Sequence, residues 1–147
     1  MAGYAKLRKI ASSYKSNDPP AVVRDCILRE LGDISGLELF GDQVMVATYT
    51  RPEMTAGGII LTDSALQQDR FQSKVGLVLK LGPLAFKDDA VNGVFFGGAN
   101  VAVNDWVFFR PADGMEFFSE DRTGGVPCRV FRDRDIKGRL SDPSAVW

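Results

Sequence analysis

The spacing of hydrophobic residues changes near residue 37 of the chain. Before this point, apolar side chains recur at helical spacing after Asp18, at Val23, Cys26, Ile27, Leu31 and Ile34. This pattern predicts an amphipathic helix of about twelve residues, which is marginal on its own and needs a surface to cover. Asp18 is its expected N-cap and Gly32 its expected stop. The apolar face has two possible partners, the chain's own domain or another subunit.

From residue 37 onward the pattern becomes that of short strands separated by turns. Strand-like runs occupy residues 43–49, 75–81, 101–103, 106–109 and 129–132. Asn92-Gly93 and Asp113-Gly114 are expected hairpin turns, because both residue types tolerate positive φ. The sequence therefore predicts an all-β fold, a small barrel or sandwich with a short helical N-terminal extension. Its expected organisation is an arm over residues 1–36 and a β domain over residues 37–147.

Residues 50–72 fit neither a core strand nor a short turn. Polar flanks surround the pair Gly57-Gly58, which is followed by the apolar triplet Ile59, Ile60 and Leu61. Long connections in compact domains are usually functional or disordered. One interpretation makes the triplet a core strand, and the other makes it an exposed hook that orders on a partner.

The charge balance and the lack of histidine exclude several classes of function. The 147-residue chain has 18 basic and 19 acidic residues, a formal net charge of -1, and no histidine. Near-neutral charge argues against nucleic acid as a partner, and the lack of histidine excludes a Ser-His-Asp triad or a histidine-ligated metal site. Cys26 and Cys128 are too far apart for a Cys-x-x-Cys site, so we expect two buried thiols.

The remaining candidate features give no signal of secretion, membrane insertion or catalysis. Residues 1–16 contain four basic and no acidic residues, without the apolar run of a signal peptide or a membrane span, so a cytoplasmic protein with no membrane partner is expected. The acidic pairs Asp88-Asp89 and Asp133/Asp135 are interpreted as solvated turn residues, because no general base or phosphate loop accompanies them. Trp106, Phe108 and Phe109 are expected in the core.

Four ordered blocks of the chain resemble the small co-chaperonins typified by GroES. They are residues 42–61, which include Thr55-Ala-Gly-Gly-Ile-Ile-Leu61, and residues 74–82, 101–109 and 131–136. The resemblance implies an irregular five-stranded barrel whose subunits form a ring. It also implies a mobile loop at residues 50–72, with Gly57, Gly58, Ile59, Ile60 and Leu61 binding the partner, and a roof hairpin between Gly82 and Ala99.

Family members close their ring by pairing the last strand of one subunit with the first strand of the next. By this resemblance, residues 37–40 and 136–140 are expected to be edge strands, with Leu37, Leu39, Ile136 and Leu140 at the interface of a homo-oligomer. No catalytic residue, cofactor or metal is needed, since ATP chemistry belongs to the chaperonin.

The arm has no counterpart in typical members and resembles that of phage-encoded co-chaperonin-like proteins. Two functions follow. The chain is either a lid of a ring chaperonin, assisting capsid protein folding in the host cytoplasm, or a virion component. In the virion, the basic arm and the amphipathic segment would hold a cement subunit to the major capsid protein.

Overall fold

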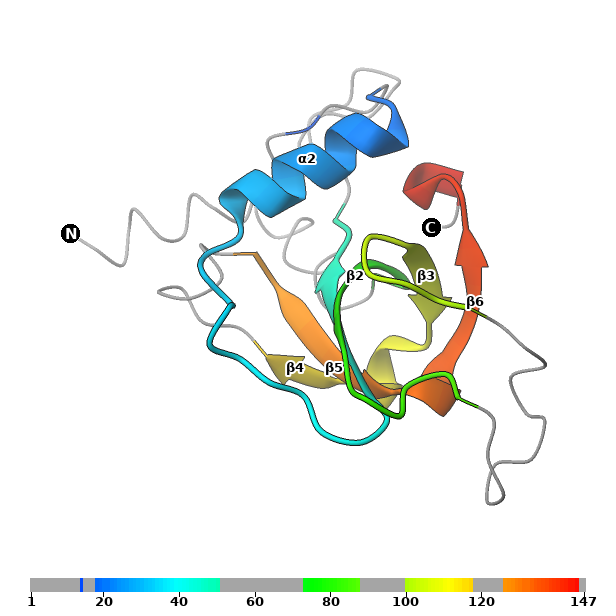
Figure 1. The fold of residues 1–147 in the computed structure, drawn as a ribbon. Coiled ribbons are helices and arrows are strands. Elements are labelled where there is room, and N and C mark those ends of the chain that lie inside the picture. Colours follow the sequence, from blue (N-terminus) through cyan, green and yellow to red (C-terminus); the bar gives the residue numbers. More distant parts are fainter. Residues whose placement is uncertain (1–13, 15–17, 51–72, 88–99, 118–125, 146–147) are drawn as a thin grey trace.

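The computed structural model describes residues 14, 18–50, 73–87, 100–117 and 126–145 (Figure 1). These residues form one helix, α2 (Pro20–Glu30), and one antiparallel sheet. The strands are β1 (Gln43–Thr48), β2 (Val75–Leu81), β3 (Trp106–Phe109), β4 (Met115–Phe117), β5 (Cys128–Arg132) and β6 (Ile136–Leu140). Short 3-10 turns lie at Pro111–Asp113, Asp133–Asp135 and Pro143–Ala145. The all-β fold class, a small barrel with an N-terminal helix, is confirmed.

Strand β1 lies at the centre of the sheet, in the order β4-β5-β1-β2-β3-β6. It pairs with β2 from Val44 opposite Leu81 to Thr48 opposite Gly76, with a bulge between Met45 and Val46. Its other edge pairs with β5. Because successive side chains of a strand point to opposite faces, β1 contributes to two cores.

The two cores lie on the two faces of the sheet. The first contains Met45 and Ala47 with residues of α2, β2 and β3, and the second contains Val44 and Val46 with the rings of Phe109 and Phe131. These two rings lie 4.3 Å apart between centroids. Burial of β1 on both faces explains why its sequence, QVMVAT, is almost continuously apolar.

Helix α2 covers the first core. Its buried residues Val23, Cys26 and Ile27 belong to the same cluster as residues of β1, β2 and β3. The helix therefore packs against its own domain, which decides between the two partners that the sequence left open. Its N-cap is Pro19, with no side-chain hydrogen bond at the cap, so the prediction of an Asp18 cap was wrong. The first helical residue is Pro20, and proline suits that position because the first helical N–H groups have no partner within the helix.

Most predicted strands are confirmed, with three differences. Residues 37–40 and 101–103 form no strand, and β4 was not predicted. Asp113-Gly114 is not a hairpin turn, since Gly114 has a φ of -101° and β4 pairs with β5 rather than with β3. The predicted turn at Asn92-Gly93 lies outside the described residues.

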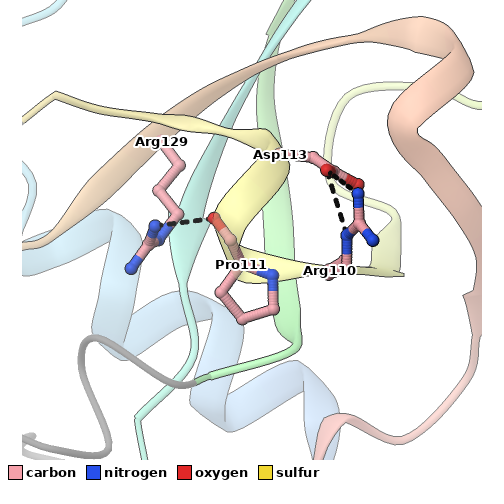
Figure 2. A network of polar contacts seen from close by, with 4 residues as sticks. All are labelled: Arg110, Pro111, Asp113 and Arg129. Carbon is pink, nitrogen blue, oxygen red and sulfur yellow. Dashed lines mark hydrogen bonds and ion pairs between the residues drawn. The ribbon is translucent and has the colours of Figure 1, made fainter.

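The connection from β3 to β4 is braced by charged side chains (Figure 2). Arg129 Nη1 donates a hydrogen bond to the carbonyl oxygen of Pro111 at 2.9 Å, and Arg110 Nη2 lies 2.6 Å from Asp113 Oδ1. The Arg110 guanidinium holds the pKa of the Asp113 carboxyl below its usual value. These contacts turn the chain from β3 across to the far edge of the sheet, where β4 pairs with β5.

Candidate functional site

The predicted partner-binding residues Gly57, Gly58, Ile59, Ile60 and Leu61 lie outside the described residues. The structure does describe both ends of the segment that contains them. Thr50 and Ser73 are buried, with side chains 6% and 1% exposed. We call these two residues and their immediate partners the first loop root.

Hydrogen bonds hold the two ends of the first loop root together. The Ser73 hydroxyl donates to the carbonyl oxygen of Tyr49, and the Tyr49 N–H donates to the carbonyl oxygen of Val75 at 2.9 Å. These bonds extend the pairing of β1 with β2 beyond its last paired residues, Thr48 and Gly76. The segment 51–72 therefore begins and ends at neighbouring points of the sheet.

Aromatic rings fill the space beneath the first loop root. The ring of Tyr14 stacks on Tyr49 at 5.5 Å between centroids, and Tyr49 meets Trp106 edge to face at 6.1 Å. Burial, with a smaller contribution from the Asp142 carboxylate, raises the pKa of Tyr49 to about 12. The Tyr49 hydroxyl is therefore neutral at physiological pH. Trp106 and Phe109 are core residues, as predicted, and Phe108 is half-buried against the first core.

A second connection leaves the sheet between Lys87 and Asn100, where the resemblance expects the roof hairpin. The fully buried Asp133 accepts a hydrogen bond at Oδ2 from the N–H of Phe86 at 3.1 Å. Arg139 Nη1 donates to the carbonyl oxygen of Asn100 at 2.9 Å and lies 3.1 Å from Asp105 Oδ2. We call this set the second loop root.

Asp133 is not the solvated turn residue that the sequence suggested. Its side chain is 0% exposed, and burial raises the pKa of its carboxyl above the ordinary value. Its role is structural, since it supports Phe86 in a backbone conformation with a φ of 59°, which is uncommon for a residue with a side chain.

The four predicted interface residues take different places. Ile136 and Leu140 lie on β6, which pairs with β3 and ends the sheet order among the described strands. Leu37 and Leu39 lie in a segment without a strand, where Lys80 Nζ donates to the carbonyl oxygen of Leu37. Leu37, Leu39 and Leu140 pack against the first core, and Ile136 packs against the second.

Sequence reasoning missed Tyr14, Ser73 and Asp133 as structural anchors. Each acts through a partner far away in the sequence, 36 residues from Tyr14 to Thr50 and 47 from Asp133 to Phe86. No local signal distinguishes Tyr14, since Tyr4 is a second tyrosine in the same arm.

Both cysteines are free and buried, as predicted, and burial raises the pKa of Cys128 to about 12, so its thiol is a poor nucleophile at neutral pH. The described residues hold no group of three or more potential metal ligands. No helix in the part of the chain that the structure describes is long and apolar enough to cross a membrane.

The β domain of the chain matches a known protein family. Residues 37–138 match the family described as the Chaperonin 10 Kd subunit. The match begins at the residue where the hydrophobic pattern changes, ends within β6, and covers more than two thirds of the chain. It includes all six strands except the last two residues of β6, and it leaves α2 and Tyr14 outside. The chain therefore belongs to the GroES-type co-chaperonin family, whose members are partners of ring chaperonins.

Proposed function

We propose that this protein is a non-enzymatic lid that closes the folding chamber of an ATP-dependent ring chaperonin. The observation that carries the proposal is the family match over residues 37–138, which spans almost the whole sheet and all of the two loop roots except Tyr14 and Arg139. The ATP chemistry belongs to the chaperonin, so the chain itself needs no catalytic residue.

In this proposal, Ile59, Ile60 and Leu61 bind the chaperonin, and Gly57-Gly58 supplies backbone freedom for a turn before them. Each buried apolar side chain contributes roughly 1.5–3 kcal/mol, and ordering of the segment offsets part of that gain. A single segment therefore binds weakly. Several identical segments on one oligomer bind firmly, because each first contact raises the effective concentration of the next.

The oligomer is proposed to form through β6 and residues 37–40, with Leu37, Leu39, Ile136 and Leu140 at the interface. Two observations support β6 as one side of this interface. It has one strand partner, β3, among the described residues, and its residues alternate between half-buried and exposed. Such an edge presents N–H and C=O groups for pairing with another chain. A protein that sediments as a monomer at micromolar concentration would contradict ring formation.

We further propose a phage-encoded protein that acts on capsid proteins in the host cytoplasm, on the basis of the arm's resemblance. The alternative, a virion component bound to the major capsid protein, needs apolar surface on the amphipathic segment. Most of that apolar surface already packs against the chain's own sheet, since Val23, Cys26 and Ile27 are buried in the first core. The packing of α2 thus favours the lid.

The test is capture of the protein by a purified bacterial ring chaperonin in the presence of ATP. Replacing Ile59, Ile60 and Leu61 together by serine should abolish capture and leave thermal unfolding nearly unchanged. The control is Leu84→Ser, the same type of substitution at a single leucine that is 55% exposed, and this variant should bind as the wild type does. A large loss of stability in the triple variant would instead show that the triplet is a core strand.

A further inference from the structure

Tyr14 is the described residue of the N-terminal arm that reaches the first loop root. It lies outside the family match, and its side chain is 4% exposed. Its hydroxyl donates a hydrogen bond to the carbonyl oxygen of Thr50 at 2.5 Å and accepts one from the Thr50 N–H at 3.2 Å. One phenol thus binds both backbone polar groups of Thr50, the residue at which the predicted mobile loop of residues 50–72 begins.

The position of Thr50 explains why this contact matters. Pairing of β1 with β2 ends at Thr48, and the N–H of Tyr49 makes a last bond to Val75. Thr50 lies one residue further and is buried, so its N–H and C=O need partners that the strand no longer supplies. Tyr14 takes the place that a neighbouring strand would have.

Ring stacking on Tyr49 holds the Tyr14 side chain in place, in addition to the hydrogen bonds of its hydroxyl. The Tyr14 and Tyr49 rings are nearly parallel, with an interplanar angle of 14°, and Tyr49 rests on Trp106 of β3. The contact therefore joins the arm to the sheet through three rings. Because the rings belong to the first core, the direction in which the chain leaves β1 is set by buried structure.

We propose that Tyr14 is a positioning residue for the partner-binding segment, so that the N-terminal arm sets the affinity of this protein for its chaperonin. The proposal rests on the proposed function. A segment whose starting point is held in place loses less conformational freedom when it binds, and preorganisation of this kind strengthens binding without a new contact. The arm is thus a part of the lid that acts from outside the family domain.

The test compares the full-length wild type with Tyr14→Phe, which removes the hydroxyl and keeps the stacked ring. The matched control is Thr50→Val, which removes the Thr50 hydroxyl, 3.4 Å from the Tyr14 hydroxyl, and leaves both backbone bonds in place. Amide hydrogen exchange at Thr50, thermal unfolding, sedimentation and affinity for a bacterial ring chaperonin with ATP are measured for each protein.

We expect Tyr14→Phe to exchange the Thr50 amide faster and to bind the chaperonin roughly tenfold more weakly, with an unchanged oligomeric state. Thr50→Val should match the wild type in affinity. If Tyr14 contributed only to the stability of the fold, Tyr14→Phe would not change the affinity for the chaperonin while the oligomeric state stayed constant. Wild-type or tighter binding by Tyr14→Phe would overturn the inference, as would unchanged exchange at Thr50.

Failure of the proposed function gives a different result. If serine at positions 59, 60 and 61 leaves capture intact, the lid mechanism through this segment is wrong, whatever Tyr14→Phe does. If the serine variant loses capture and Tyr14→Phe binds as tightly as the wild type, the proposed lid function is supported and the proposed positioning role of Tyr14 is wrong.

Discussion

The two loop roots are attached to the same sheet by different chemistry. The first loop root is held by hydroxyl and backbone groups of buried, uncharged residues, Tyr14, Tyr49, Thr50 and Ser73. The second depends on charged side chains, the buried carboxylate of Asp133 and the half-exposed guanidinium of Arg139. Neutral buried bonds respond little to salt and pH, whereas ionic ones respond to both.

This difference matters for a protein that is proposed to bind its partner through the first segment. An attachment of neutral groups keeps the same geometry over a wide range of solution conditions, since the Ser73 hydroxyl and the backbone groups of Tyr49 and Thr50 do not titrate near neutral pH. The ionic contacts of the second loop root, in contrast, weaken or strengthen as pH and salt concentration change. The following four variants separate the two attachments, from the largest expected effect to the smallest.

Replacing Tyr49 by alanine should have the largest effect, because it removes the ring between Tyr14 and Trp106. We expect a loss of about 3–5 kcal/mol in the free energy of unfolding, measured by urea denaturation followed by circular dichroism. Val103→Ala, at a side chain that is 48% exposed, is the control and should change stability by less than about 0.5 kcal/mol. A loss of similar size in both variants would show that the aromatic stack has no special role.

Replacing Asp133 by alanine should have the next largest effect. The Phe86 N–H then loses its carboxylate acceptor next to the second loop root, and we expect a loss of about 1–3 kcal/mol. Asp133→Asn retains an acceptor oxygen and should lose less. Hydrogen exchange at Phe86 should accelerate in the alanine variant, and exchange at Thr50 should change little. Equal acceleration at both amides would mean that the two roots are not independent.

The pH dependence of stability should also come from the second loop root. Burial raises the pKa of Asp133 in the folded state above its ordinary value of 3.8, so the folded protein holds this proton more tightly than the unfolded chain does. This group's contribution to stability is therefore greatest at low pH, and it falls as pH rises from about 3.8 through the raised pKa of the folded state. Asp133→Asn should remove this component from a series of urea unfolding curves between pH 3 and pH 7. An identical slope in the variant would contradict the assignment.

The smallest effect is expected for Arg139→Met, which keeps an apolar stem and removes the charge. Arg139 is 51% exposed, so its ion pair with Asp105 should contribute at most about 1 kcal/mol. That contribution should shrink further when salt is raised from low to molar concentration, because exposed charges are screened. Tyr14→Phe is the matched variant at the first loop root, and its effect on unfolding should not depend on salt.

The strands were predictable wherever local sequence determines them. Strands β1 and β2 are apolar runs bounded by turn residues, and the helical stripe around Val23 and Ile27 matches the residues that α2 buries. Strand β4 escaped prediction because Met115 and Glu116 are exposed, and its pairing with β5 gives no hydrophobic pattern.

The loop roots were beyond prediction because their determinants are distant in the sequence. No residue near Tyr14 in the sequence predicts its hydrogen bond to Thr50. The residues around Asp133 are those of an ordinary turn, and its burial depends on the distant contact with Phe86. Residues 37–40 alternate as a strand does, yet Lys80 binds the backbone there instead. Local patterns specify the elements, and long-range polar contacts specify how the connections leave them.

The central place of β1 has a consequence for how the chain folds. Gln43 pairs with Arg132, about ninety residues later, so the middle of the sheet cannot be completed until nearly the whole chain has left the ribosome. Contacts between such distant residues make folding slow. During synthesis α2 emerges before β1, and its apolar stripe is available to cover one face of the nascent β1 while β5 is still being made. Because the N-terminal extension is made before β1, it is in place to shield this apolar strand from solvent during translation.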